Sequence, residues 1–425
     1  MGYRAPPIRP ALTLREVFGP DPVFNPRASF RRYGWIPHEA SVLDPLTGGV
    51  LAVAGGTPTI CSAGVATARG LDLLWEAGLP EVGNLLPYAD EAEYYRRIGE
   101  VIAAGRPLVL QHVHRAPEIP SQSYWVARSV LAFLNNKGNL ADLVPAEAVP
   151  PRQLVEPREL LALAARPSRL PLFVKAASDR TSGGGGAVIL VRSPVDLFHA
   201  ARKYAGCRHV VVEEFLEFKQ NFCLNFAVTA GHEIHYLGAG EQLTSESGGY
   251  QGNWFEHDRR PPAEAVHLGR EIMCRAAARG YRGFAGFDMG VLPDGRVKVF
   301  DLNFRVNGST KALLVYDGVQ EAWDAPRVSL LCGLQGSDSF SQMCDRAGEA
   351  VHSRIVVPMA TYDPAAVSGC PGNPSVSALV LGESRNEVLA KLKYLSGRGL
   401  RNKLFEPCAA PPESPPEAWR DRRAA

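Results

Sequence analysis

Residues 284–305 constrain the fold more than any other stretch, because two strand-like runs flank Asp294-Gly295 there. Asp-Gly between such runs is the strongest short-range signal for a β-hairpin. A two-residue turn would place Asp288 directly opposite Asp301. Side chains that face each other in this way lie roughly 5 Å apart, and two like charges at that distance repel. We therefore expect a cation between the two carboxylates.

Side chains alternate along a strand, which divides this segment into two faces. Asp301, Asn303 and Arg305 would share one face. The other face would carry apolar side chains, those of Phe300, Leu302, Phe304 and Val306. A surface hairpin with a solvated acidic face is the alternative, but the amide, the guanidinium and the apolar reverse face favour a metal site. Oxygen ligands favour Mg²⁺ or Mn²⁺ over zinc, so the candidate ligands are Asp288, Asp301 and Asn303.

Composition places the chain among ordinary globular proteins and argues against several other classes. Its 425 residues can bury more than one core. A formal net charge of +2 gives no electrostatic footprint for nucleic acid or an anionic membrane. No apolar run reaches spanning length, the first residues lack the apolar core of a signal peptide, and the eight cysteines form no CxxC pair. We expect a cytoplasmic protein whose cysteines stay reduced.

Residues 1–125 are expected to form an N-terminal arm and a small α/β domain. The chain up to about residue 30 is rich in Pro and Arg, which predicts an irregular arm. Apolar runs then alternate with helical patterns, as in a parallel sheet, with strands expected at 49–54 and 107–114 and helices at 66–77 and 91–104. His112 and His114 share a strand face, where a hydrogen-bonded or solvent-facing pair is favoured over a metal site without a third ligand.

The rest of the chain divides into three further regions. A helical bridge from Tyr124 to Leu134 introduces a second α+β region, which we place at 126–330. Residues 331–405 contain two strand-like runs and a helical pattern, which predict a short C-terminal α/β subdomain. The tail, 406–425, contains five prolines and mixed charge and is expected to be disordered. The fold class is therefore α/β and α+β, in several domains.

A lysine and a glycine-rich segment together indicate a phosphate site. Lys175 ends a short apolar strand, and the glycines that follow lead into a second strand; they are Gly183, Gly184, Gly185 and Gly186. A strand, a glycine loop and a strand can fold backbone N–H groups over phosphates, with the lysine as the cation. The segment is neither a Walker A loop nor a Rossmann fingerprint, because no helix follows the glycines. Taken alone, it is equally compatible with a flexible linker.

The apolar strand 209–216 ends in Glu213, Glu214 and Leu216. Such a strand exit can present backbone groups to the edge of an adenine, with the leucine against the ring. A core strand with a solvated acidic end is the alternative reading of the same residues.

The order of these parts resembles that of the ATP-grasp ligases, over roughly residues 125–315. The strongest element is the run from Phe300 to Arg305, which is similar to the family's acidic-x-Asn-x-Arg motif. Residues 30–125 then resemble the pre-ATP-grasp domain that precedes this fold. With its C-terminal extension, the chain looks most like the pheganomycin-type peptide ligases, which implies a place in natural product biosynthesis.

The resemblance implies a role for each motif residue in binding ATP. Lys137 and Lys175 would hold the α- and β-phosphates, and the glycine loop would close on the triphosphate. The adenine would lie against Glu213, Glu214 and Leu216. Gln220 stands where the family has a ribose-binding carboxylate, which is a departure because Gln carries no charge.

The family would also place one or two Mg²⁺ ions on Asp288, Asp301 and Asn303. Asp301 replaces the more usual Glu, whose longer side chain bridges both metals, so the second ion is less secure. The implied reaction activates a carboxylate as an acylphosphate and joins it to the amine of an amino acid or peptide, with release of ADP and phosphate. Arg305 and Asn307 are the candidate catalytic residues for the tetrahedral oxyanion.

Two other functions of the same fold remain open, an ATP-grasp kinase and a non-catalytic ATP-binding regulator. The expected partners are a carboxylate and an amine, with neither nucleic acid nor membrane, and a homodimer is left open. The polar, glycine-rich loop 245–255 fits a substrate-side lid or an ordinary connection equally well.

Overall fold

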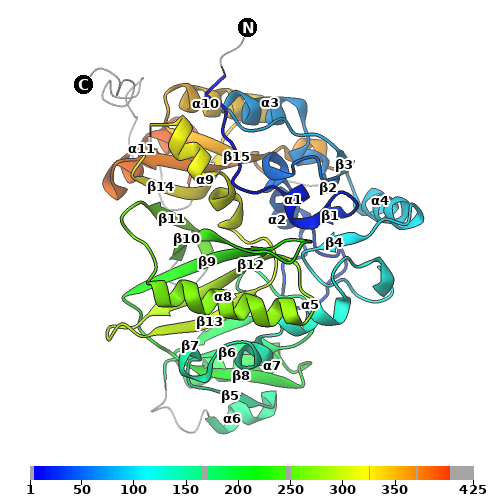
Figure 1. The fold of residues 1–425 in the computed structure, drawn as a ribbon, viewed down its shortest axis with the longest axis vertical. Helices are drawn as coiled ribbons and strands as arrows, with labels where there is room; N and C mark the ends of the chain where they lie inside the picture. The colour runs from blue at the N-terminus through cyan, green and yellow to red at the C-terminus, as the bar shows by residue number, and fades with distance from the viewer. Residues whose placement is uncertain (1–3, 164–169, 245–249, 325, 370–371, 403–425) are drawn as a thin grey trace.

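The computed structural model describes residues 4–163, 170–244, 250–324, 326–369 and 372–402. These residues form three β-sheets with helices packed on them (Figure 1). The small sheet of β5–β8 lies at one end of the molecule, and the largest sheet runs through its middle to the other end. No helix in the described ranges is both long and apolar enough to span a bilayer. The predicted tail, 406–425, lies outside the described residues.

The N-terminal domain contains the expected parallel sheet, in the order β3-β2-β1-β4. Its strands are β1 (Val23–Asn25), β2 (Thr59–Ser62), β3 (Leu85–Tyr88) and β4 (Leu108–Leu110). The two helices predicted here are confirmed as α3 (Ala68–Glu76) and α4 (Glu91–Ala103). The Asp90 side chain caps α4 by accepting a hydrogen bond from the Glu93 N–H. Short helices α1 (Leu14–Phe18), α2 (Ala40–Leu43) and α5 (Arg128–Asn135) complete the domain.

Two predictions for this domain are wrong. The apolar run 49–54 is not a strand, because the chain there forms short 3₁₀ turns, η1 (Pro45–Gly48) and η2 (Leu51–Val53). All three residues of η2 are buried, so the run reflects burial on every side rather than strand periodicity. Conversely, β1 lies within the segment predicted as an irregular arm, where it forms an inner strand of the sheet.

The large sheet has nine strands in the described part of the chain, in the order β13-β12-β9-β10-β11-β14-β16-β15, with β17 paired to β14. Its strands are β9 (Gln220–Val228), β10 (Ile234–Thr244), β11 (Tyr250–Glu256), β12 (Gly283–Val291), β13 (Val297–Asn303), β14 (Val328–Gly336), β15 (Val356–Tyr362), β16 (Ser375–Gly382) and β17 (Leu400–Arg401). Helices α8 (Ala263–Ala278), α9 (Thr310–Ala322), α10 (Phe340–His352) and α11 (Arg385–Gly397) accompany it. The strands of the predicted C-terminal subdomain thus continue this sheet; the boundary at 330 stays a prediction.

The small sheet is antiparallel, in the order β5-β8-β6-β7. It consists of β5 (Arg152–Val155), β6 (Leu172–Ala177), β7 (Val188–Val191) and β8 (His209–Glu214), with helices α6 (Leu160–Leu163) and α7 (Pro194–Lys203). Its apolar side chains form a core of their own, which includes Val174, Leu197 and Val210. The predicted strand, glycine loop and strand are confirmed as β6, residues 178–187 and β7.

The turn of the β12–β13 hairpin is one residue longer than predicted. A backbone hydrogen bond from the Leu292 N–H to the Arg296 carbonyl (2.9 Å) closes a three-residue loop, 293–295. Gly295 has a φ of 93° there, the left-handed conformation that such loops require at their last residue.

A bulge in β13 compensates for the longer turn. Met289 pairs with Val299, but the next pair is Asp288 with Asp301, so Phe300 is the extra residue. The predicted opposition of the two aspartates is therefore confirmed, although the turn that was expected to produce it is wrong.

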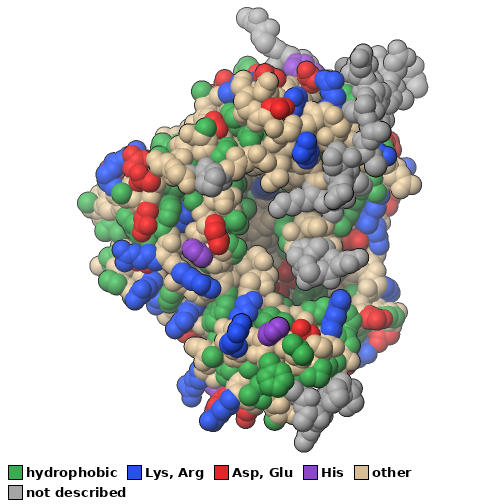
Figure 2. Space-filling view, turned by 180° about the vertical axis from the view of Figure 1, so that it is seen from behind, with side chains coloured by type: hydrophobic (Ala, Val, Ile, Leu, Met, Phe, Trp, Pro, Cys, Tyr) green, Lys and Arg blue, Asp and Glu red, His purple; other side chains and the backbone are tan. Residues whose placement is uncertain are grey.

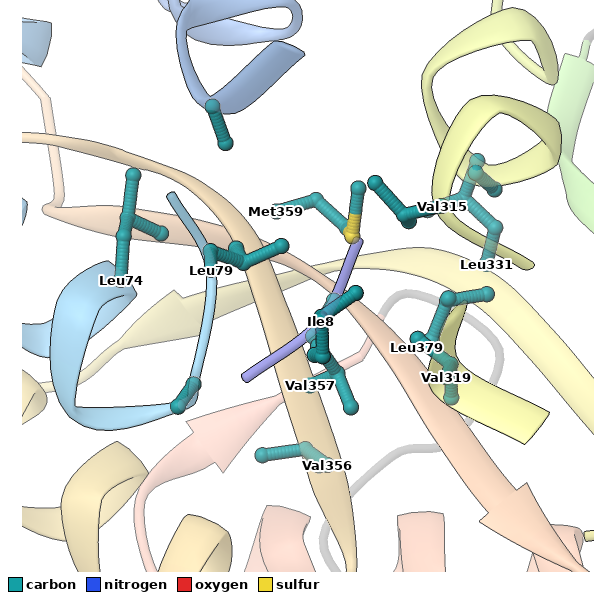
Figure 3. Packing of buried hydrophobic residues seen from close by; sticks show 14 of the residues in the cluster. Ile8, Leu74, Leu79, Val315, Val319, Leu331, Val356, Val357, Met359 and Leu379 are labelled. Atoms are coloured by element: carbon teal, nitrogen blue, oxygen red, sulfur yellow. The ribbon is translucent and has the colours of Figure 1, made fainter. Parts of the chain in front are cut away.

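An extended N-terminal segment joins the N-terminal domain to the large sheet. The Ala5 N–H donates to the Glu76 carbonyl and the Ala11 N–H to the Leu314 carbonyl, both at 2.7 Å. Between them, Ile8 is 2 % exposed and lies among apolar side chains of α3, α9, β14, β15 and β16 (Figure 3). Burial of such a side chain contributes about 1.5–3 kcal/mol.

Candidate active site

The site lies on one face of the β12–β13 hairpin, where the N-terminal domain, the large sheet and the small sheet meet. Figure 2 shows the molecule hollowed between its upper and lower parts on this side. Asp288 on β12 and Asp301 on β13 face each other as cross-strand neighbours. The structure thus brings the two predicted metal ligands together.

Asp288 is surrounded by amides rather than by cations. One carboxylate oxygen accepts a hydrogen bond from Gln242 Nε2 (2.8 Å), and the other lies 3.5 Å from Asn303 Nδ2. Burial, followed by the charge of Asp301, raises the pKa of Asp288 to about 7. A divalent ion between the two carboxylates would relieve this repulsion.

Asp301 lies in a cationic environment, in contrast to Asp288. Lys137 Nζ is 2.5 Å from Asp301 Oδ1. Burial acts to raise the pKa of Asp301, but the ammonium groups of Lys137 and Lys175 outweigh it, and the pKa is lowered. Asp301 is thus ionised at neutral pH, and the predicted phosphate lysine Lys137 lies directly beside the predicted metal face.

Arg305 is held between two amide side chains at the edge of this face. Its Nη2 donates to Asn303 Oδ1 (2.6 Å) and its Nη1 to Asn135 Oδ1 (3.2 Å). The Asn135 oxygen also accepts the Phe304 N–H at 3.0 Å. Asn303 therefore presents its oxygen to Arg305 and its amide nitrogen to Asp288, so it would have to turn over to ligate a metal through oxygen.

Lys175 on β6 and Glu213 on β8 form a buried ion pair within the small sheet, next to the hairpin. Lys175 Nζ contacts the Glu213 carboxylate and donates to the Phe300 carbonyl at 2.7 Å. Arg152 on β5 lies on the other side of Glu213, with Nη1 3.6 Å from Oε2. The Glu213 side chain is 2 % exposed, and its carboxylate lies between the two cations. Contacts with an adenine at this position would therefore be made by the backbone.

The other predicted adenine and ribose residues lie on the crossing from β8 to β9. Glu214 is exposed, and Leu216 and Gln220 are partly buried. Phe218, in the same crossing, stacks on Phe300 with ring centroids 5.4 Å apart. The crossing therefore packs directly on the hairpin that carries Asp301.

The glycine loop is anchored to the N-terminal domain at its base. The Trp35 N–H donates to the Thr181 carbonyl (2.8 Å), and the Gly183 N–H donates to the Trp35 carbonyl (3.3 Å). Gly184 and Gly185 have φ values of 58° and 76°, so the tip of the loop uses the left-handed region that glycine adopts freely. A cavity beside Arg305 is lined by residues 179–182 of this loop and by His112.

Asn307 begins the turn that leads into α9. Its Oδ1 accepts hydrogen bonds from the Ser309 and Thr310 backbone N–H groups at 3.1 and 3.2 Å, and from both hydroxyls. Its Nδ2 lies 3.4 Å from Cys223 Sγ. The side chain is therefore engaged in holding the start of α9, and a role for Asn307 would be one of positioning.

Of the two histidines that sequence reasoning considered, His114 is hydrogen-bonded through both ring nitrogens. His114 is buried, with Nε2 2.8 Å from the Tyr94 hydroxyl and Nδ1 3.0 Å from the His112 carbonyl. No group of three His, Cys, Asp or Glu side chains with metal-binding geometry occurs in the described ranges. Part of the predicted lid, 245–249, lies outside those ranges, and its remainder, from Tyr250, forms β11.

Four functional candidates escaped sequence reasoning. Asn135, Arg152 and Gln242 hold the charged groups of the site, and Lys311 lines a cavity next to it. None lies in a motif, because each reaches the site through a strand or helix that is remote in sequence. Only Lys311 could have been singled out from the sequence, because lysines are few in this chain.

Two family models match the chain. One, described as the ATP-grasp region of L-aspartate–L-methionine ligase, matches residues 150–303. The other, described as the N-terminal domain of L-aspartate–L-methionine ligase, matches residues 13–132. Both follow the chain order found here, with the N-terminal sheet before the nucleotide half.

Solved structures of low sequence identity share the fold. An N5-carboxyaminoimidazole synthetase from Staphylococcus aureus, complexed with ADP, has 12 % identity and a TM-score of 0.56, over 90 % of this chain and 99 % of that one. A biotin carboxylase from Campylobacter jejuni has 14 % identity and a TM-score of 0.55, over 90 % of this chain and 92 % of that one. An L-amino acid ligase from Bacillus licheniformis has 13 % identity and a TM-score of 0.51, over 90 % of this chain and 99 % of that one. At these identities the likeness shows the fold alone.

Proposed function

Because the chain belongs to the ATP-grasp superfamily of carboxylate–amine ligases, we propose that it joins two free amino acids into a dipeptide. It is an ATP-dependent ligase, which activates a carboxylate and transfers it to an amine. The matching models suggest the substrates, with L-aspartate supplying the carboxylate and L-methionine the amine. ADP and phosphate would be the other products.

The observation that carries this proposal is the charged face formed by Asp288, Asp301 and Arg305. Two opposed carboxylates of which one has a pKa of about 7 fit a single divalent ion between them. When bound, Mg²⁺ would neutralise charge on the triphosphate. Asp288 and Asp301 would hold it, with Asn303 as a third ligand only if its amide turns over.

Lys137 and Lys175 would position the phosphates of ATP on this face. Lys137 forms an ion pair with Asp301, and Lys175 contacts the Glu213 carboxylate and donates a hydrogen bond to the Phe300 carbonyl. Phosphoryl transfer depends mostly on positioning and charge neutralisation, which two fixed ammonium groups supply. The glycine loop, whose base is tied to Trp35, would cover the triphosphate.

Arg305 would then act on the acyl group. Attack of an amine on an acylphosphate forms a tetrahedral oxyanion, and phosphate leaves when it collapses. A guanidinium held by Asn135 and Asn303 is already oriented and can donate to that oxygen. The amine is itself the nucleophile and loses a proton to solvent or to the departing phosphate, so no protein base is required.

The test is an ADP-release assay coupled to mass spectrometry of the products. With ATP, Mg²⁺, L-aspartate and L-methionine, we expect ADP and a dipeptide whose mass is the sum of the two amino acids less one water. Each substrate is also omitted in turn. Release of ADP without any amine, or no product with any pair from a panel of amino acids, would overturn the proposal.

A further inference from the structure

A cavity of about 250 Å³ lies beside the charged face but is separate from it. Gly308 and Tyr250 line one end, and Leu46 of the N-terminal domain and Tyr362 and Val376 of the C-terminal strands line the rest. Since a water molecule occupies roughly 30 Å³ of liquid, the cavity has room for a molecule the size of one amino acid.

One end of this cavity borders the reaction centre. Gly308 directly follows Asn307, whose side chain packs against Gly286. Gly286 in turn pairs with Asn303 across the hairpin. A group bound at the Gly308 end is therefore close to the face that holds Asp288 and Arg305.

Lys311 supplies a cation to the cavity wall. Its Nζ donates to Ser377 Oγ at 2.7 Å. In the described part of the chain, no Asp or Glu lines the cavity or forms an ion pair with Lys311. Burial lowers the pKa of Lys311 to about 8. An ammonium that is partly buried without a counter-charge is costly, and an anion from outside the chain would offset that cost.

The remaining lining is mostly apolar, from side chains such as Leu46, Leu331 and Val376. A ligand that suits this wall has an apolar body and a single anionic group. A dicarboxylate would leave one charge against apolar carbon.

We propose that this cavity binds the amino acid that supplies the amine, with its carboxylate on Lys311 and its apolar side chain against the lining. The amine then points toward the Gly308 end, where the acyl group is formed. This inference rests on the proposed function and adds the site at which the second substrate binds and the residue that holds its carboxylate.

The test compares L-methionine with L-methioninamide, whose carboxylate is replaced by a neutral amide. Binding is measured by calorimetry on the full chain with ADP and Mg²⁺, so the result does not depend on turnover. We expect the wild-type protein to bind methionine at least tenfold more tightly than the amide. In Lys311→Met this preference disappears, because methionine affinity falls to that of the amide, whereas Lys311→Arg retains a preference.

Lys393→Met is the matched control, since it removes an exposed lysine from α11 and should leave both affinities unchanged. Thermal unfolding checks that each variant is folded. A preference that persists in Lys311→Met, or no binding of methionine by the wild-type protein at millimolar concentration, would overturn the proposal. If methionine binds as expected but no dipeptide forms in the assay above, the proposed function fails and the binding site stands.

Discussion

The two carboxylates at the centre of the site differ in their neighbours and therefore in their charge. Asp288 accepts hydrogen bonds from amides, whereas Asp301 lies against Lys137 and near Lys175. The second aspartate thus remains ionised while the first has a pKa of about 7. At the scale of single residues, the site depends on which side chain approaches each oxygen, and not on the number of acidic groups.

Replacement of Arg305 tests the oxyanion role directly. Arg305→Ala should lower kcat of ligation by roughly 10²–10³, the usual loss when one oxyanion donor is removed. The KM for ATP should change little, because the lysines that would hold the phosphates remain. Steady-state kinetics measures both constants. Arg296→Ala is the control, since Arg296 at the exposed hairpin turn pairs only with Asp294 among the described residues; a normal ligation rate in Arg305→Ala would remove Arg305 from the mechanism.

The positive charge of Lys311 should lower the stability of the folded protein. Its pKa in the folded state, about 8, lies below the ordinary value of 10.5. Below pH 8 the folded protein carries the full free-energy cost of this charge. Between pH 8 and 10.5 the unfolded chain binds more protons at this lysine than the folded protein does, so stability rises with pH and the cost is relieved. Lys311→Met should therefore have a higher Tm than the wild-type protein at pH 7.

The same comparison at several pH values completes this test. The difference in Tm between Lys311→Met and the wild-type protein should shrink between pH 8 and pH 10. Differential scanning calorimetry without substrates measures it. A lower Tm for Lys311→Met at pH 7 would mean that Lys311 has a partner that stabilises the fold.

At the scale of elements, the bulge in β13 connects the hairpin to the small sheet. The extra residue, Phe300, restores the opposition of Asp288 and Asp301, and its carbonyl accepts a hydrogen bond from Lys175. One irregularity thus aligns the candidate metal ligands and fixes a candidate phosphate lysine. Bulges commonly redirect side chains at functional sites.

Glu213 should be needed to keep β5, β6 and β8 together around this lysine. Glu213→Gln removes the counter-charge of Lys175 and Arg152, and loss of one partner from a buried pair costs about 3–5 kcal/mol. We expect a lower Tm and a higher KM for ATP. Glu214→Gln changes the next, exposed residue and should alter stability by less than about 0.5 kcal/mol. Equal stability of the two variants would contradict the ion-pair assignment.

Short-range sequence patterns predicted some elements correctly. They failed where a buried apolar segment had the composition of a strand but a different conformation. The Asp-Gly turn and the alternation after it identified the hairpin, and the helical pattern of 91–104 identified α4. The run 49–54 was wrong because an apolar 3₁₀ segment buried on all sides has no period of its own. Arg152 and Lys311 could not be predicted as site residues, because their partners lie far away in sequence.

At the scale of the whole molecule, one sheet draws its strands from residues 220–401 and connects the central and C-terminal regions. Strand β14 pairs with β11 on one side and β16 on the other, so the sheet crosses the boundary predicted at residue 330. This pairing joins residues that are about 40 to 78 positions apart, and periodicity within a segment carries no information about it.

A fragment of residues 126–330 should therefore not fold by itself. It would lack most of β14 and all of β15, β16 and β17, so β11 would lose most of its partner strand, and the apolar side chains of α9 that share a core with β15 and β16 would be exposed. We expect an insoluble fragment, or one without a cooperative thermal transition by circular dichroism. The chain of residues 4–402 is the control. A soluble fragment that unfolds cooperatively would establish 126–330 as an independent domain.

The N-terminal segment limits how this molecule can move. Ile8 lies in the core between the N-terminal domain and the C-terminal strands, and hydrogen bonds on either side of it tie the segment to α3 and to α9. A hinge between those two parts would have to extract that side chain in every catalytic cycle. The small sheet has a separate core, and its contacts with the rest include the Lys175 hydrogen bond to the Phe300 carbonyl and the contacts of Trp35. Substrate entry and product release should therefore follow the rocking of β5–β8, and the turnover rate should depend on how fast that sheet opens.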